Sequence, residues 1–430
     1  MNKTLSLSIA LLFSANAAAI TQSEFAKRLQ EVHPFFTQQG FDQQTSKLDY
    51  IATTANQDWV LTGSVDSINS LNTQSSSSTI GATHNLVDTG ADITISNVWS
   101  DGVATDRLSV SYTQPLLKGI GGVNDQLKGD LSIIKIDINN LKRAQNAEQF
   151  ILSQLFKLVD LSFAQQQLTL TTQRLELSQQ ELTLVKEKFT QSVVDQVDVF
   201  LQEDAYQRVL QKQFQAEQEL DLLKEELSVL LKIPSMQIKS DFNLYTLYQS
   251  NLGNLQDYLR QDTTEMKISQ LERTLLQRQL LSDKNNTQAQ LNLELGASNS
   301  NDNDWRVGLG LSYPLGDTKA KSALEKTKIG LSKAKENSKE QLINLTIKAS
   351  VLNKKLMHLV KLLGTYQARI KIAQSRALAE KKRYELGNSP ISFVISAQNN
   401  VHDVNLAYAQ VAANYQKSVL EFKAVVDQLL

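Results

Sequence analysis

Apolar residues recur at intervals of seven along much of this 430-residue chain. Two such series lie two positions apart: Leu161, Leu168, Leu175, Leu182 and Phe189, and Phe163, Leu170, Leu177 and Leu184. Residues two apart on a helix point about 200° away from each other, so the pattern predicts a helix with apolar stripes on opposite faces. A two-stranded coiled coil has only one such seam. A helix with two seams needs a neighbour on each side, as in a cylindrical wall of helices.

The pattern predicts long helices with short breaks between them. They are expected over residues 129–191, 193–231, 255–288, 317–386 and 391–430. The first would be about 90 Å long at 1.5 Å per residue, far longer than a core helix of a compact domain. The prolines at positions 34, 115, 234, 314 and 390 all fall at breaks, as a helix-dominated chain requires. We therefore expect the helices to pack side by side as coiled coils.

The second half of the chain repeats the first at an offset of 195 residues. The offset carries the first heptad series onto Leu356, Leu363, Ile370, Ala377 and Tyr384, and it carries Ser192 onto Gly387 and Val199 onto Val394. Heptads alone would match at multiples of seven, and 195 is not one of them. The match therefore holds because the turns between the helices align as well, which indicates a duplication.

Two alternating runs precede the long helix of each half: 59–65 and 107–112 in the first, and 291–297 and 306–313 in the second. Apolar residues alternate there with polar or small ones, as in a barrel strand with lipid on one side and water on the other. Four aromatic residues lie near the strand ends, where a membrane-interface girdle belongs: Trp59, Tyr112, Trp305 and Tyr313. The pattern by itself also allows a soluble β-hairpin.

The connections within these strand pairs differ in length. Residues 298–304 make a short polar turn, whereas residues 66–105 are rich in Ser, Thr and Asn and are expected to form a long outer loop. Ile93 and Ile95, which alternate with polar residues, indicate some additional strand within that loop. Four strands cannot close a barrel, since bacterial barrels need about eight or more. The chain must therefore oligomerise, and three copies would supply twelve strands.

Composition and the N-terminus place the chain outside the cytoplasm. Residues 1–19 read as a cleaved secretory signal: Lys3, then an apolar run, then a small-residue cleavage site ending at Ala19. The chain has no cysteine, so disulfides, thiolate metal sites and a lipid anchor on cysteine are excluded. The 44 basic and 45 acidic residues nearly balance, which argues against a nucleic-acid partner.

No pattern typical of catalysis or ligand binding is present. The four histidines are scattered without metal-ligand spacing: His33, His84, His358 and His402. The glycine-rich run at 119–122 is not followed by the Lys-Ser/Thr pair of a phosphate loop and is expected to be a linker. We therefore expect no catalytic, cofactor-binding or metal site, and no enzymatic activity.

Two motifs and the duplicated order of elements carry a resemblance to a known family. One is Ser111-Tyr112-Thr113-Gln114-Pro115-Leu116-Leu117-Lys118-Gly119, and the other is Tyr384-Glu385-Leu386-Gly387, with Phe189-Thr190-Gln191-Ser192 in the equivalent place of the first half. Over nearly its whole mature length the chain resembles the TolC-like outer-membrane efflux proteins. The resemblance implies a mainly α channel-tunnel: a homotrimer with four strands per protomer in one shared 12-stranded barrel and a helical barrel that reaches through the periplasm.

The resemblance also implies a division of the chain. After the signal, 20–58 is the N-terminal helical segment, 59–115 the first two strands with the outer loop, and 116–233 the first helical hairpin. Residues 234–288 are then the equatorial loop and helix, 289–315 the last two strands, and 316–430 the second hairpin. The hairpin turns, near 189–198 and 384–393, become periplasmic tips that meet a periplasmic adaptor (a membrane fusion protein) and an inner-membrane transporter of the ABC, RND or a similar class. Seven residues are expected to form the docking region: Phe189, Ser192, Val193, Tyr384, Gly387, Asn388 and Pro390.

The pore gate implied by the resemblance is altered in this chain. Expected constriction residues are Asp195, Asp198, Ser389, Phe393 and Ser396. Phe393 and Ser396 stand where family members often carry two aspartates, and Ser389 stands where some carry an arginine. We expect a hydrogen bond between Tyr384 and Asp198 to remain, with a weaker lock on the closed tip.

The sequence thus predicts a passive exit duct of a tripartite efflux or type I secretion system, embedded in outer-membrane lipid and extending into the periplasm. A periplasmic coiled-coil adaptor or scaffold is the main alternative, and an adhesin on a trimeric stalk is a third. The strands favour the duct, because a scaffold has no need of strands with one lipid-facing side. The substrate, the transporter class and the ion selectivity are left open.

Overall fold

The computed structural model describes residues 19–70, 73–101, 106–249, 253–299 and 303–429. All of the expected signal segment except Ala19 lies outside these residues. The chain divides into two compact units. The helical unit comprises Met1–Phe36, Ala147–Leu252 and Ile347–Leu430, and the sheet unit comprises Thr37–Asn146 and Gly253–Thr346.

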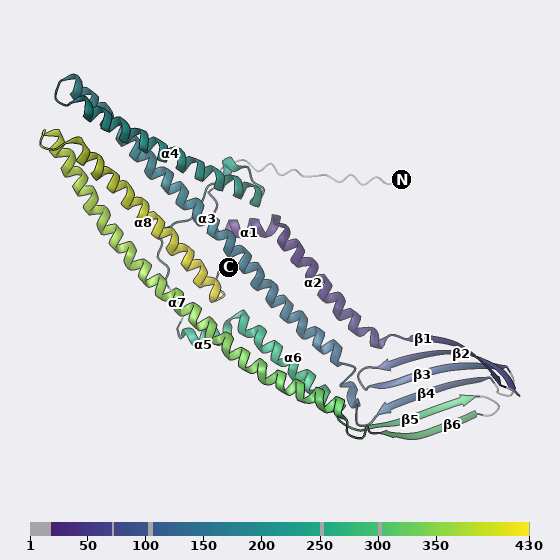
Figure 1. The fold of residues 1–430 in the computed structure, drawn as a ribbon. Coiled ribbons are helices and arrows are strands. Elements are labelled where there is room, and N and C mark those ends of the chain that lie inside the picture. Colours follow the sequence, from purple (N-terminus) through teal and green to yellow (C-terminus); the bar gives the residue numbers. More distant parts are fainter. Residues whose placement is uncertain (1–18, 71–72, 102–105, 250–252, 300–302, 430) are drawn as a thin grey trace, which may run out of the picture. The chain divides into compact units, whose positions relative to one another are not determined.

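Most of the described chain is helical (Figure 1). The helices are α1 (Gln22–Val32), α2 (Pro34–Thr53), α3 (Leu127–Thr190), α4 (Gln196–Leu231), α5 (Leu255–Asp262), α6 (Thr264–Asn286), α7 (Thr318–Glu385) and α8 (Ile391–Val425), with short 3-10 turns at Thr54–Gln57, Ile120–Gly122 and Ser235–Gln237. The prediction of long helices is confirmed. The helix expected over 255–288 is instead two, because Thr263 is extended (φ −74°, ψ 142°) and its buried hydroxyl bonds to the Leu259 carbonyl at 2.6 Å.

Heptad packing holds the helical unit together. Four members of the series predicted on α7 are buried: Leu356, Leu363, Ala377 and Tyr384. Runs of small residues on α8, such as Ala412 and Ala413, let neighbouring helices approach closely. Large apolar side chains remain exposed elsewhere on these helices: Phe200, Phe214, Leu222 and Val229 on α4, and Val351, Ile372 and Leu378 on α7. The single chain therefore leaves apolar surface uncovered on both hairpins.

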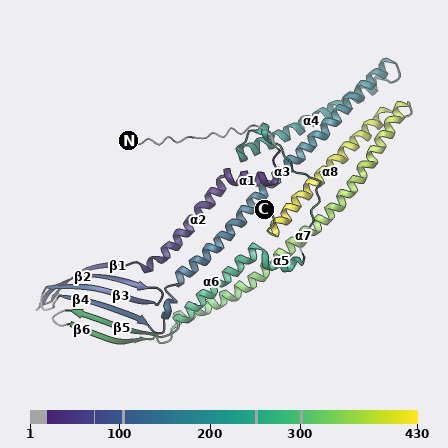
Figure 2. The same cartoon turned by 180° about the vertical axis from the view of Figure 1, so that it is seen from behind.

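The strands of the sheet unit form one antiparallel sheet in the order β1-β2-β3-β4-β5-β6. They are β1 (Val60–Ser70), β2 (Thr73–Leu86), β3 (Ala91–Asp101), β4 (Arg107–Pro115), β5 (Gln290–Asn299) and β6 (Asn303–Ser312), and both views show them side by side (Figures 1 and 2). The prediction of four strands per chain was therefore wrong. The expected outer loop 66–105 is mostly strand: the end of β1 and the β2–β3 hairpin.

Polar cross-strand pairs explain why this hairpin forms despite its low hydrophobicity. The Thr83 and Thr94 hydroxyl oxygens lie 3.2 Å apart, and those of Ser96 and Ser109 lie 2.7 Å apart. Such Thr and Ser pairs stabilise a sheet, but they carry no apolar signal that a sequence pattern would register. The composition of this hairpin therefore predicts a loop, whereas its cross-strand pairing makes it part of the sheet.

No helix of the described chain combines the length and the apolarity that crossing a bilayer requires. Nor do the described residues bring three or more His, Cys, Asp or Glu side chains together in a way that could hold a metal ion.

Candidate functional site: the two helical tips

The turn between α3 and α4 is closed by the backbone. Val193 N–H donates to the Lys188 carbonyl (2.9 Å) and Ser192 N–H to the Phe189 carbonyl (2.9 Å), the two bonds of a Schellman motif. Ser192 takes the left-handed conformation, with φ 57°. Asp195, in an extended conformation, is then the N-cap residue of α4.

The turn between α7 and α8 repeats this geometry bond for bond. Asn388 N–H donates to the Arg383 carbonyl (2.9 Å) and Gly387 N–H to the Tyr384 carbonyl (3.0 Å). Gly387 has φ 75°, and Pro390 begins α8 from an extended conformation. Every one of these positions lies 195 residues after its counterpart, so the duplication seen in the sequence extends to the hydrogen bonds of the tips.

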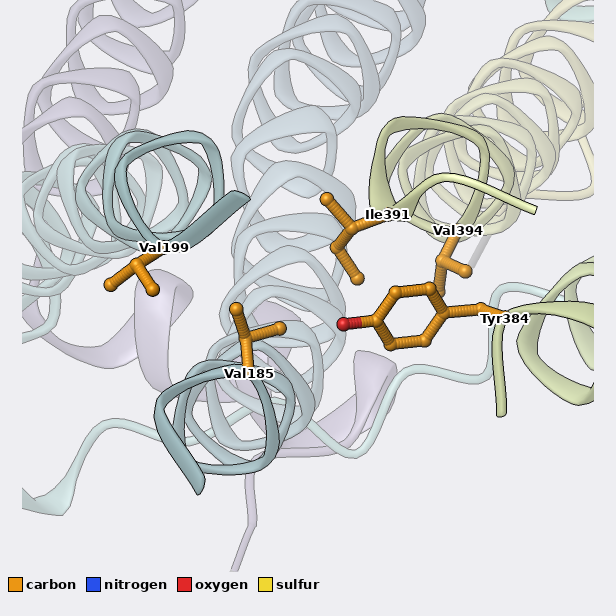
Figure 3. Close-up of a cluster of buried hydrophobic side chains, with 5 residues drawn as sticks. All are labelled: Val185, Val199, Tyr384, Ile391 and Val394. Carbon is orange, nitrogen blue, oxygen red and sulfur yellow. The ribbon is translucent and has the colours of Figure 1, made fainter. Parts of the chain in front are cut away.

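A buried apolar cluster joins the two hairpins just behind their tips. It comprises Val185 of α3, Val199 of α4, Tyr384 of α7, and Ile391 and Val394 of α8. Figure 3 shows the Tyr384 ring reaching from α7 toward Val185, with its hydroxyl leading. Tyr384 is 5% exposed, so its packing holds one hairpin against the other just behind the tips.

Lys188, rather than Asp198, makes the polar contact with Tyr384. The Lys188 ammonium lies 4.1 Å from the centre of the tyrosine ring and donates to the Tyr384 carbonyl at 3.4 Å. The tyrosine hydroxyl is buried and has no hydrogen-bond partner in the described structure. The expected Tyr384–Asp198 hydrogen bond is therefore wrong. Burial raises the pKa of Tyr384, and the nearby Asp198 charge raises it further.

The other predicted tip residues lie mostly at the surface. Phe189, Ser192, Val193, Asn388 and Pro390 are exposed, as are Asp195, Phe393 and Ser396 of the expected constriction. Ser389 is half-buried and donates to Glu380 on α7 at 3.3 Å. Ser396 lies on a groove between α4 and α8 together with Asp204, Arg208 and Asp403. Within each turn the structure thus joins predicted residues through the backbone, Ser192 with Phe189 and Gly387 with Tyr384. It also places Tyr384 close to Asp198.

Sequence reasoning missed a buried polar network that crosses the helical unit. The Arg174 guanidinium of α3 forms an ion pair with the Glu181 carboxylate (3.3 Å), one heptad further on. It also donates a hydrogen bond to the side-chain carbonyl of Asn399 on α8 (3.3 Å). Gln202 of α4 bonds to the same Glu181 carboxylate at 3.3 Å and to the Ser178 carbonyl at 3.3 Å. Three helices are therefore tied together through one buried ion pair.

The electrostatics of this network reflect its burial. Arg174 is 5% exposed and Glu181 is 6% exposed. Burial raises the pKa of Glu181, and the Arg174 charge and the Gln202 hydrogen bond oppose that rise. The spacing carried a signal: Thr171, Arg174, Ser178 and Glu181 follow the three-four spacing of a buried helix stripe. The leucine heptads do not include these polar positions.

Comparison with solved structures shows a shared fold. CusC, described as forming a transmembrane channel, aligns at TM-score 0.73 with 11% identity over 97% of this chain and 95% of its own. The outer-membrane protein VceC from Vibrio cholerae aligns at 0.69 with 8% identity over 94% of this chain and 95% of its own. The MtrE outer-membrane channel of Neisseria gonorrhoeae, in its open state, aligns at 0.70 with 10% identity over 95% of this chain and 89% of its own.

No family model matches the sequence, and no curated protein matches it. At these identities the structural likeness establishes the fold alone. The chain accordingly has the TolC-like channel-tunnel fold, with long helices and a sheet that stays open within one protomer.

Proposed function

We propose that this chain of channel-tunnel fold is a passive exit duct of the outer membrane: a homotrimer, exported by a cleaved signal, that has no chemistry of its own. The observation that carries the proposal is the apolar face of the sheet. Large side chains project from it into open space, among them Leu61 (75% exposed), Leu311 (72%) and Trp305 (80%). A water-soluble protein rarely exposes so continuous an apolar surface, whereas lipid would cover it.

The uncovered surfaces of the helical unit support oligomerisation. Exposed apolar residues lie on α4 of one hairpin and on α7 of the other. Packing α7 of one copy against α4 of the next would cover both stripes, and repeated head-to-tail contacts close into a ring. A wall of helices needs this arrangement, and the TolC-like resemblance implies three copies.

The tips are proposed to dock a periplasmic adaptor and, through it, an inner-membrane transporter. Both tips expose apolar side chains beside rigid turns: Val193 (61% exposed) and Val197 (64%) on one hairpin, and Leu386 (66%) and Phe393 (50%) on the other. An apolar patch rimmed by polar residues is typical of a protein–protein contact. Opening would then part the Tyr384 cluster and carry substrate outward without any reaction.

Planar-bilayer conductance of the detergent-extracted protein, with the native mass measured on the same sample, tests the proposal. We expect a trimer that inserts into lipid and gives small, discrete openings, since the Tyr384 cluster holds the tips closed. A water-soluble, non-conducting protein of another stoichiometry would contradict the duct. The periplasmic scaffold would then be the better explanation.

A further inference from the structure

The β2–β3 hairpin continues the two-faced pattern of the rest of the sheet. In the register, Leu61 pairs with Ala82, Ala82 with Ile95, Ile95 with Val110, Val110 with Ala297, and Ala297 with Trp305. This row crosses all six strands and is apolar throughout. The next row is small or polar throughout: Thr62, Gly81, Ser96, Ser109, Ser298 and Asp304. At this level of the sheet the hairpin therefore has a lipid-type face and a water-type face that are continuous with those of β4, β5 and β6.

The turn of this hairpin is built into the base of the sheet. Residues 87–90 lie against the glycine-rich linker that leads from β4 to α3. A Cβ at Gly122, where φ is +64°, would collide with the Val87 carbonyl, and a Cβ at Gly90, where φ is +73°, would lie 2.5 Å from the Gly119 carbonyl. A contact this close leaves no room for any side chain. The turn thus lies at the end of the sheet where α2 enters and α3 leaves, not at the outer end.

Paired residues in this sheet are also offset along the strands from β1 to β6, as the tilted strands of a barrel require. The row that starts at Val60, the first residue of β1, passes through Thr83, Thr94, Ser111 and Gly296 and reaches Arg306. Arg306 lies six residues before Ser312, where β6 ends. Six residues at about 3.3 Å each, over five strand spacings of about 4.8 Å, correspond to a tilt of about 40°. Outer-membrane strands tilt by about 35–45°.

Both edges of this sheet are open and suited to each other. β1 and β6 have no strand beyond them in the described protomer, and the six-strand order alternates, so that β6 runs opposite to β1. The two edges expose apolar side chains on the same face, such as Val65 (78% exposed) on β1 and Leu309 (69%) on β6. An unpaired edge of this kind is a template for another chain.

We infer that β6 of each protomer pairs with β1 of a second copy, so that the trimer closes an eighteen-stranded barrel to which β2 and β3 contribute wall rather than outer loop. The inference rests on the trimer of the proposed function. Barrel diameter grows roughly in proportion to strand number, and barrels of about 16–18 strands leave an aqueous channel. The mouth of an eighteen-stranded barrel is therefore about half again as wide as that of a barrel with twelve strands.

Tryptophan fluorescence in vesicles tests the place of β3. The chain has three tryptophans, so W59F/W305F leaves only Trp99 on β3, and W59F/W99F leaves only Trp305 on β6 as the matched control. In lipids with brominated acyl chains we expect both variants to lose a similar fraction of their emission. Quenching of Trp305 without Trp99 would overturn the inference and leave the duct intact. Absence of quenching in both would overturn the proposed function itself.

Cysteine substitution tests the strand pairing, and the cysteine-free chain provides a clean background. Leu309→Cys is combined in turn with Leu61→Cys, Gly63→Cys or Val65→Cys, and the membrane-embedded trimer is oxidised. We expect at least one pair to give covalent trimers, whereas Leu309→Cys with Ile95→Cys, which lies on the interior strand β3, gives none. A native trimer in which none of the three β1 positions cross-links would contradict the pairing.

The two faces of β3 provide an independent readout. Ile95→Cys lies on the apolar row and Ser96→Cys on the polar row. In intact vesicles a membrane-impermeant thiol reagent should label Ser96→Cys through the lumen and spare Ile95→Cys. Equal labelling of both is the result expected of an outer loop, and it would overturn the eighteen-stranded barrel.

Discussion

At the scale of single residues, the contact between the hairpins depends on the Tyr384 ring rather than on its hydroxyl. The ring is packed in an apolar cluster beneath the Lys188 ammonium, and the hydroxyl oxygen is buried without a hydrogen-bond partner among the described residues. Leaving a buried polar group unsatisfied costs about 1–3 kcal/mol. The contact between the hairpins is thus stabilised by the packing of the Tyr384 ring and by the Lys188 ammonium over its face. The buried hydroxyl destabilises it.

This contact predicts opposite outcomes for two substitutions of one residue. Tyr384→Phe removes the unsatisfied hydroxyl and keeps the ring, so we expect unchanged or slightly higher thermal stability and unchanged channel closure. Tyr384→Ala removes the packing as well and should cost about 3–5 kcal/mol, with larger and more frequent openings. Single-channel recording and thermal unfolding of the same samples measure both. Larger openings in Tyr384→Phe would reinstate a hydrogen bond from the hydroxyl, with Asp198 the first partner to test.

The two tip turns make a second matched pair at this scale. Both need a left-handed residue, and only the second turn has glycine there. A left-handed conformation costs a non-glycine residue about 1–2 kcal/mol. Ser192→Gly should therefore stabilise the first hairpin by about 1 kcal/mol, whereas Gly387→Val should destabilise the second by at least as much.

No heavy atom lies within 4 Å of a Cβ placed at Gly387, so the cost there is backbone strain rather than a clash. Chemical denaturation measures both changes, and an export assay should show impaired export by Gly387→Val with trimers still in the outer membrane. Loss of the trimer itself would argue against a role confined to the tip.

At the scale of elements, the helices are packed by two different kinds of seam. The α7 seam is apolar, with Leu356 and Leu363 buried in heptad register. The buried stripe of α3 near the tip includes polar side chains, among which Arg174 and Glu181 pair. A buried ion pair adds little net stability compared with apolar residues, but losing one partner leaves an uncompensated charge. The polar stripe therefore penalises any rearrangement that separates the three helices it joins.

A double-mutant cycle on this ion pair should be strongly non-additive. Arg174→Met and Glu181→Leu alone should each destabilise the protein by about 3–5 kcal/mol, because each strands a buried charge. The double substitution should cost much less, since Gln202 keeps its bond to the Ser178 carbonyl. Urea denaturation of the four proteins gives the coupling energy. Additive losses would mean that the two side chains act independently.

At the scale of the whole molecule, a single copy of the chain leaves strand edges and apolar surface uncovered. Its sheet has two open edges, and its helices expose apolar side chains on both hairpins. Hydrophobic surface of this extent is stable only against lipid or another copy of the chain. This exposed surface supports the assembly and membrane insertion that we propose.

The helical stripe on α4 gives a prediction at this scale. Phe214 is 59% exposed in the protomer, and a neighbouring copy would cover it. Phe214→Glu should weaken the trimer in detergent and shift its native mass toward smaller species, because association would bury a charge. Phe214→Leu, which keeps an apolar side chain at the same position, is the control and should keep the trimer. Equal behaviour of the two variants would show that this stripe is not an interface.

The sequence by itself determined the periodic features of this protein. Heptads specify helices through side-chain spacing alone, and the offset of 195 residues by itself places Ser192 and Gly387 in equivalent turns. Strict alternation likewise identified β5 and β6. Features of this kind are local, because each follows from how residues close in the chain share one face of a helix or strand.

The tertiary structure alone decided the features that depend on partners far apart in the chain. It placed Lys188 rather than Asp198 on Tyr384, and it paired Arg174 with Asn399 across 225 residues. It also made strands of the Ser- and Thr-rich run within 66–105, where hydroxyl groups such as those of Thr83 and Ser96 pair across neighbouring strands. The physical reason is common to all three: a polar group gains stability from whichever partner is nearest in space, and linear spacing does not encode that distance.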